Sequence, residues 1–207
     1  MIRVLIVDDH PLAVAGLRML LGAAAGIEIA GATDSAAGAL STYASLRPDV
    51  VICDYYLPVR NGLYLVEQLL RSDPACKILV VSSVETAEIP AQLLRAGALG
   101  YVVKAADASV LIRAVRKVAK GERYVDESLA GAALFEPSEL DKISGRLLQV
   151  LTLLAEGRTN AEIAMELEIG EVTVRRHKSR LLAKLGIDRE TALIAMARAA
   201  GFGRNPC

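Results

Sequence analysis

The 207-residue sequence is poor in aromatic residues and in cysteine, and it has no tryptophan. Aromatic residues make up 4% of the chain and hydrophobic residues 53%, so aliphatic side chains and alanine must fill any core. The three cysteines, Cys53, Cys76 and Cys207, form no even set and lack metal-ligand spacing. This excludes a disulfide framework and a cysteine zinc site, and it favours a cytoplasmic protein with reduced thiols.

Long hydrophobic runs and a net charge are also missing. No apolar stretch reaches the about 18 residues of a membrane span. The first residues carry one basic side chain and run directly into Asp8 and Asp9, without the cleavage region of a signal peptide. The formal net charge is zero. We therefore expect a cytoplasmic protein with no membrane partner, long enough for one large domain or two small ones.

Strand and helix patterns alternate through the first 120 residues. Apolar runs at 2–7, 27–30, 49–53, 77–81 and 100–103 predict buried strands, and an apolar period typical of a helix follows each of them. Five such units predict the α/β class, with a doubly wound, five-stranded parallel sheet in the order 2-1-3-4-5. We assign residues 1–120 to this domain, 121–142 to a linker and 143–207 to a smaller all-α domain.

Polar side chains stand where the predicted strands end. Asp8 and Asp9 follow the first strand, Asp54 the third, Ser82 the fourth and Lys104 the fifth. The predicted strand order brings the three carboxylates together, and these cannot all stay ionised at close range without a cation. Mg²⁺ prefers such oxygen ligands. A carboxylate beside Mg²⁺ can attack a phosphoryl group, and a serine hydroxyl and a lysine would stabilise the product.

Residues 1–120 resemble the receiver domain of two-component response regulators. The resemblance rests on Asp8, Asp9, Asp54, Pro58, Gly62, Ser82, Tyr101 and Lys104. It implies that Asp54 is the phosphoacceptor of a sensor histidine kinase. The implied ligands of Mg²⁺ are Asp8, Asp9, Asp54 and the backbone carbonyl of Tyr56. The resemblance further implies that Lys104 and Ser82 bind the phosphoryl group and that the rotamer of Tyr101 follows Ser82.

Alternatives exist for each of these residues. Taken singly, Asp8 and Asp9 could be helix-capping acids worth about 1 kcal/mol, and Lys104 a solvated surface lysine. Haloacid-dehalogenase-type phosphatases use similar residues, but their nucleophile lies in an Asp-x-Asp motif after the first strand. Here the acidic pair comes first and Asp54 lacks that motif. This order argues against an enzyme.

The rate of dephosphorylation can also be predicted. Tyr56 and Val84 stand two residues beyond the acceptor and two beyond the switch hydroxyl, where they flank the path of an attacking water. One is bulky and the other apolar. We therefore expect slow hydrolysis of the phosphorylated form.

A helix-turn-helix pattern occupies the last seventy residues. Apolar periods predict helices over 144–156, over 161–167 with Asn160 as cap, and over 171–185. The three-residue turn at 168–170 has the length that a helix-turn-helix uses. Arg175 and Arg176 fall on the outward face of the third helix, as expected of a recognition helix in the major groove. Taken alone, they could instead form a solvated helix face, which is the less favoured alternative.

This segment resembles the LuxR-type helix-turn-helix, the effector of the NarL/FixJ subfamily. The matching residues include Asn160, Glu162, Ile163, Ala164, Thr173, Val174, His177 and Gly186. The resemblance implies double-stranded DNA as a partner and a homodimer in the active form. The residues expected at DNA are Thr173, Arg175, Arg176, Lys178, Ser179, Arg180 and Lys184. The family usually has a glutamate where this chain has Leu147, which predicts the loss of a polar tie between helices.

The combined pattern predicts a transcriptional response regulator that is switched by phosphorylation of Asp54. Segments 84–90 and 121–124 resemble the global activator regulators of the Gac/Uvr type. The alternative is a phosphorylation-independent, dimeric DNA-binding regulator in which the receiver serves only as a dimerisation module. The intact acidic cluster argues against that alternative.

Overall fold

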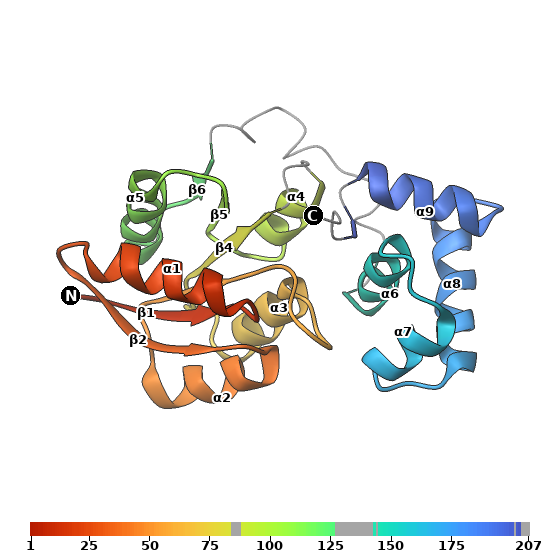
Figure 1. Ribbon diagram of the computed structural model, residues 1–207, viewed down its shortest axis with the longest axis horizontal. Coiled ribbons are helices and arrows are strands. Elements are labelled where there is room, and N and C mark those ends of the chain that lie inside the picture. Colours follow the sequence, from red (N-terminus) through yellow and green to blue (C-terminus); the bar gives the residue numbers. More distant parts are fainter. Residues whose placement is uncertain (84–87, 127–142, 144, 201, 204–207) are drawn as a thin grey trace. The chain divides into compact units, whose positions relative to one another are not determined.

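The computed structural model describes residues 1–83, 88–126, 143, 145–200 and 202–203, and the chain forms two compact units (Figure 1). Strands and helices alternate in the N-terminal part. In chain order they are β1 (Ile2–Val7), α1 (Pro11–Gly22), β2 (Ile27–Thr33), α2 (Ala36–Leu46), β3 (Val50–Cys53), α3 (Gly62–Ser72), β4 (Ile78–Ser82), α4 (Glu88–Arg95), β5 (Gly100–Val103), α5 (Ala108–Ala119) and β6 (Tyr124–Val125). No described helix is both long and apolar enough to cross a bilayer.

The strands form one parallel sheet in the order β2-β1-β3-β4-β5-β6. This confirms the doubly wound 2-1-3-4-5 arrangement and adds a sixth, two-residue strand. This strand lies in the segment that we assigned to a linker, where Tyr124 and Val125 pair with Gly100 and Tyr101.

The buried core of the N-terminal unit shows which helices cover which face of the sheet. One buried cluster joins Leu21 of α1 and Leu111 and Val115 of α5 to Ile6 and Ile52 of the central strands. These two helices therefore cover the same face of the sheet. Both central strands β3 and β4 are buried along their whole length, as expected for a parallel sheet with helices on each face.

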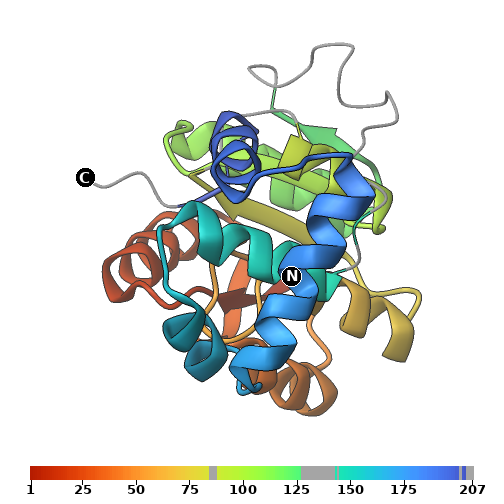
Figure 2. The ribbon, with the colours of Figure 1, turned by 90° about the vertical axis from the view of Figure 1, so that its right-hand side faces the viewer.

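The C-terminal unit is all-helical, with α6 (Gly145–Ala155), α7 (Asn160–Glu166), α8 (Glu171–Leu185) and α9 (Glu190–Ala199). Helix α8 packs against α6 and α7, and α9 packs against α6 and α8 (Figure 2). Fully or nearly fully buried side chains from all four helices meet in its core: Leu148, Leu151, Ile163, Val174, Leu181, Leu193 and Ala197. The predicted third helix has the expected bounds and ends at Gly186, whose φ is 64°.

One local prediction for this unit is corrected. Thr159, not Asn160, is the N-cap of α7, and it forms a capping box with Glu162. Leu147 stands where the family usually has a glutamate, and the neighbouring Arg146 joins α6 to the end of α7 by donating to the carbonyl oxygen of Leu167. The turn between α7 and α8 places Glu168 at a φ of 52°.

Candidate functional site

The hydrogen-bond pattern of the sheet continues past the strand ends and places the polar residues predicted from the sequence. The amide of Asp54 donates to the carbonyl oxygen of Val7, at 2.8 Å. The amide of Lys104 donates in the same way to the carbonyl oxygen of Ser82, at 2.8 Å. These backbone bonds hold the residues that follow β3 and β5 at the carboxyl edge of the sheet, where ligands bind in open α/β folds.

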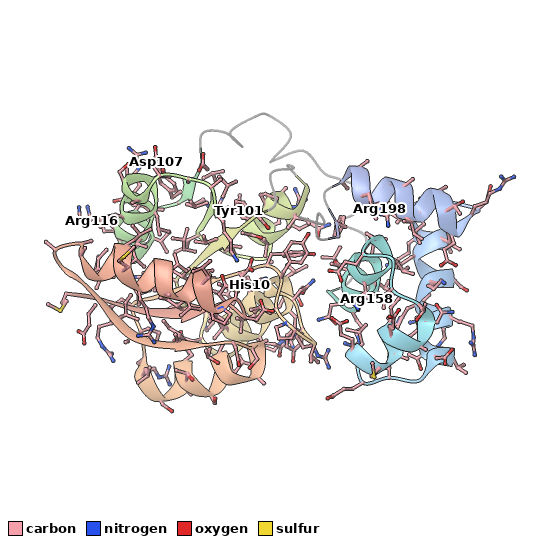
Figure 3. All side chains as sticks on the ribbon, viewed as in Figure 1. His10, Tyr101, Asp107, Arg116, Arg158 and Arg198 are labelled. Carbon is pink, nitrogen blue, oxygen red and sulfur yellow. The ribbon has the colours of Figure 1, made fainter. Side chains whose placement is uncertain are left out.

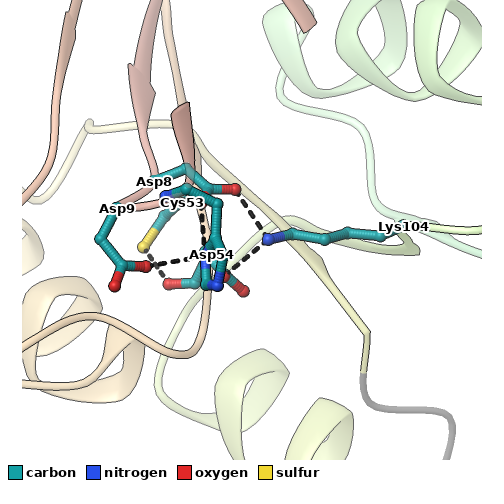
Figure 4. Close-up of polar contacts among 6 residues, drawn as sticks. Asp8, Asp9, Cys53, Asp54 and Lys104 are labelled. Carbon is teal, nitrogen blue, oxygen red and sulfur yellow. Dashed lines mark hydrogen bonds and ion pairs between the residues drawn. The ribbon is translucent and has the colours of Figure 1, made fainter. Parts of the chain in front are cut away.

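The carboxylates and the lysine meet at this edge (Figure 4). The Nζ atom of Lys104 lies 2.7 Å from Oδ2 of Asp54 and 2.7 Å from Oδ2 of Asp8. Ligand atoms of Asp8, Asp9, His10 and Asp54 lie within 4.8 Å of one another. The structure thus brings together the three acids and the lysine that the sequence predicted would share a site.

Burial dominates the electrostatics of this cluster. Asp54 is 2% exposed and Asp8 is 3% exposed. Burial raises the pKa of Asp54, and the attraction of Lys104 offsets this only in part. Burial by itself would lower the pKa of Lys104, but its interactions with Asp54 and Asp8 together raise that pKa. The single positive charge of Lys104 therefore faces three carboxylates, those of Asp8, Asp9 and Asp54, so the cluster favours a further cation.

One oxygen of the acceptor is unsatisfied. Within the described part of the chain, Oδ1 of Asp54 is buried and has no hydrogen-bond partner. A buried carboxylate oxygen is normally paired, so this one is available to a ligand. Oxygen atoms from three carboxylates form a donor set that fits Mg²⁺. His10, which the sequence analysis did not single out, joins them, with Nδ1 2.9 Å from Oδ1 of Asp9.

The loop after the acceptor is tightly folded. The amide of Gly62 donates to the carbonyl oxygen of Tyr55 at 2.7 Å, and Asn61 caps α3 through its side chain. A Cβ on residue 62 would lie 2.4 Å from the carbonyl oxygen of Asp54. Val59 has a φ of 64°, which is uncommon for a branched residue. Only glycine fits position 62 without moving the acceptor.

Ser82 and Tyr101 lie behind the site on adjacent strands. Both side chains are fully buried. The buried Ser82 hydroxyl makes no hydrogen bond of ordinary geometry among the residues described, but it lies close enough to Asp54 and Tyr101 to oppose the rise that burial causes in the pKa of both groups. Tyr56 is 7% exposed, and its ring meets that of Tyr55 edge-on at 5.0 Å between centroids. Val84, the second residue expected to flank the path of water, lies outside the described residues.

The outward face of α8 has the predicted composition. Val172, Arg175, Arg176, Ser179 and Ala183 are all exposed, while Val174 and Leu181 are buried. Arg175 forms an ion pair with Glu171, at 3.6 Å between Nη1 and Oε2. Arg180 and Lys184 are also exposed, and Thr173 is half-buried.

Lys178 differs from the other cations of α8. Its side chain is 14% exposed, and Nζ donates to Oδ1 of Asn160 at 3.0 Å and to Glu190. It therefore ties α8 to α7 and α9. Sequence periodicity could not reveal this role, because the partners come from other helices.

Comparison with known proteins identifies both parts of the chain. Residues 4–116 match the response regulator receiver domain, and residues 141–197 match the bacterial regulatory proteins of the luxR family. This chain belongs to the NarL/FixJ-type response regulators. Such regulators are DNA-binding transcriptional regulators of two-component systems and are not enzymes.

Relatives of this response regulator match it along nearly its whole length. It is 37% identical to the DNA-binding transcriptional activator DevR/DosR of Mycobacterium tuberculosis, over 100% of this chain and 98% of that protein. It is 34% identical to the response regulator GacA of Pseudomonas aeruginosa, over 95% and 96%. RcsB of Salmonella enterica serovar Typhimurium, solved bound to promoter rprA with the phosphomimetic BeF₃⁻, is 25% identical, with a TM-score of 0.71 over 95% of this chain and 98% of that one.

Proposed function

We propose that a sensor histidine kinase phosphorylates Asp54 and that this modification controls the binding of the C-terminal unit to promoter DNA in the cytoplasm. The observation that carries the proposal is the unpaired, buried Oδ1 of Asp54 among two further carboxylates and Lys104. We take residues 1–120 as the receiver, 121–142 as the linker and 143–207 as the DNA-binding domain. The active form is a homodimer.

The chemistry follows from the groups at the site. Asp8, Asp9 and Asp54, with the backbone carbonyl of Tyr56, would hold Mg²⁺, which neutralises charge as the phosphoryl group approaches. The Asp54 carboxylate forms the new bond to phosphorus, and the bond from phosphorus to the donor breaks. Lys104, already 2.7 Å from Oδ2 of Asp54, then pairs with the added charge of about −1.5 to −2.

Ser82 and Tyr101 pass this change to the surface of the receiver. The Ser82 hydroxyl lies close enough to Asp54 to influence its pKa, so phosphoryl oxygens on Asp54 can draw the hydroxyl forward. Tyr101 is fully buried next to it and can repack as the serine moves. A packed pair with two arrangements, biased by local charge, is the physical basis of such a switch.

On DNA, α8 serves as the recognition helix. Arg175 and Arg176 are exposed on its outward face and would read base edges, together with Thr173 and Ser179. The cations Arg180 and Lys184 would neutralise phosphates. Lys178 would do so only by giving up its contacts with Asn160 and Glu190.

The test is phosphorylation by acetyl phosphate, followed by measurement of DNA affinity. We expect labelling that needs Mg²⁺ and stops with a chelator, and tighter promoter binding by the labelled protein. Equal affinity with and without the phosphoryl group would instead favour the phosphorylation-independent regulator. Absence of labelling in Mg²⁺ would refute the proposal.

The lifetime of the phosphoryl group provides a prediction for Tyr56. Because this side chain is bulky and 7% exposed beside the acceptor, we expect it to exclude the attacking water, so the phosphorylated protein should persist for minutes or longer. Replacing it by asparagine should open the path and shorten the lifetime severalfold. Loss of ³²P from the purified protein measures both rates. A wild-type lifetime of seconds would contradict the prediction.

A second prediction separates base contacts from phosphate contacts on α8. Arg176→Ala should weaken operator binding about tenfold or more and leave non-specific binding nearly unchanged, because a lost base contact costs about 1–3 kcal/mol. Arg180→Ala should weaken operator and non-specific binding alike and lower the salt dependence. Electrophoretic mobility shifts at several salt concentrations give both quantities. Identical behaviour of the two variants would rule out the assigned roles.

A further inference from the structure

The solvent face of α5 is strongly basic. The helix buries Leu111, Ala114, Val115 and Val118 against the sheet. Its opposite face carries Ser109, Arg113, Arg116, Lys117 and the C-cap Lys120, all exposed. Residues 108–121 contain no acid, and the flanking acids are Asp107 and Glu122. Four cations at positions i, i+3, i+4 and i+7 thus form one stripe.

Neighbouring groups hold three of these cations in place. The guanidinium of Arg113 lies 5.9 Å from the centroid of the Tyr124 ring and donates to its hydroxyl at 3.3 Å. The ammonium of Lys117 lies 5.8 Å from the same centroid. Arg116 projects outward from α5 and donates from Nη2 to the carbonyl oxygen of Ala25 at 3.1 Å (Figure 3). This anchoring lowers the entropy cost of meeting a ligand.

The stripe lines a concave surface. A cavity of about 500 Å³ lies between α5 and the turn after α1, lined by Ala24, Ser109, Ile112, Arg113, Arg116, Lys117 and Lys120. This volume is typical of small-molecule sites. Most of the surface that faces the cavity is apolar and comes from Ala24, Ile112 and the aliphatic stems of the four cations, so the site suits an anion that also has apolar surface.

Helix stability does not account for the arrangement. Cations in the last turn favour the helix dipole, which explains Arg116, Lys117 and Lys120. Arg113 lies in the middle of α5, three residues before Arg116 and four before Lys117. Such like-charged pairs each cost a few tenths of a kcal/mol. A sequence selected only for a stable helix would place an acid among them.

We propose that this cavity binds a small ligand that carries two or more phosphate groups, such as pyrophosphate or a nucleoside polyphosphate. The four cations would contact its phosphate oxygens, and Ile112 and Ala24 would contact any apolar part. The site is separate from Asp54 and does not depend on phosphotransfer. The ligand would give this receiver a second input.

Calorimetric titration of the full-length protein tests the proposal. Inorganic pyrophosphate, ADP and orthophosphate are compared in a metal-free buffer, in which phosphotransfer to Asp54 cannot occur. We expect one pyrophosphate or ADP site and at least tenfold weaker binding of orthophosphate. Lys117→Gln and Lys120→Gln should each weaken pyrophosphate binding at least threefold. Arg71→Gln, an exposed arginine at the end of α3, and Asp54→Asn should change it less than twofold.

Three results would overturn the proposal. One is the absence of pyrophosphate and ADP binding, and another is equal binding of orthophosphate, which would indicate unspecific attraction. The third is unchanged pyrophosphate binding when both lysines are replaced in a protein that melts like wild type. If, in that third case, the double variant also loses affinity for DNA, the basic face of α5 contacts nucleic acid and not a small ligand. Tighter binding of ADP than of pyrophosphate would support a nucleotide ligand.

Discussion

Asp54→Asn should abolish phosphorylation by acetyl phosphate and remove the effect of that reagent on promoter affinity. The amide has the shape of the carboxylate but lacks the charge and the nucleophilic oxygen. In the part of the chain that the structure describes, Oδ1 of Asp54 is one of the buried side-chain atoms without a hydrogen-bond partner. Mass spectrometry of the labelled protein gives the modified residue, and fluorescence anisotropy gives the DNA affinity.

Asp49→Asn is the matched control for this substitution. Asp49 precedes β3, at the opposite end of the strand from Asp54, and its exposed side chain accepts a hydrogen bond from the amide of Arg3. The control should label like wild type, because its amide oxygen can still accept that bond. Substantial labelling of Asp54→Asn at Asp8 or Asp9 would move the acceptor to another carboxylate. Acetyl phosphate should still change the promoter affinity of Asp49→Asn. If it changes the affinity of neither variant, the receiver does not regulate DNA binding.

Gly62→Ala should destabilise the receiver by about 2–3 kcal/mol or more, a cost typical of overpacking against groups that cannot move. The added Cβ would meet the carbonyl oxygen of Asp54 at 2.4 Å and Cα of Tyr55 at 2.8 Å. Both are backbone atoms, so relief requires a shift of the loop that carries the acceptor. We therefore expect a lower midpoint in urea and slower labelling by acetyl phosphate.

Gly16→Ala tests the same chemical change where there is space. Gly16 lies inside α1, and a Cβ there meets no atom within 4 Å. Alanine should stabilise the helix by about 0.5–1 kcal/mol, because it loses less backbone entropy on folding. The two variants should thus shift the urea midpoint in opposite directions. A Gly62→Ala protein as stable as wild type would mean that the loop after β3 is not packed as described.

The sequence was sufficient for the order of the elements and for the cluster of acids with lysine. Buried parallel strands need continuous apolar runs, and such runs end abruptly where the chain leaves the core. This is why Asp54 and Lys104 could be recognised at strand ends. The outward face of α8 was predictable for a similar reason, because helical periodicity separates Val174 and Leu181 from Arg175 and Arg176.

Other features depend on residues far apart in the chain. The Lys178 contacts with Asn160 and Glu190, and the Arg146 bond to the carbonyl oxygen of Leu167, join different helices. The sixth strand forms because Tyr124 and Val125 pair with the edge of β5. A strand of two residues is too short to show an alternation of apolar and polar side chains in the sequence. The cap at Thr159 was missed because Asn160 is an equally good capping residue by type.

By itself, the sequence determined which residues are buried and which polar groups lie at strand ends, because hydrophobic period and chain direction are local properties. Tertiary structure decided which of those polar groups form ion pairs and hydrogen bonds with one another. Lys104 sits between Asp8 and Asp54, one oxygen of Asp54 is left unpaired, and Tyr124 holds Arg113 at a basic cavity. Such pairings depend on distances between strands and helices that only packing sets.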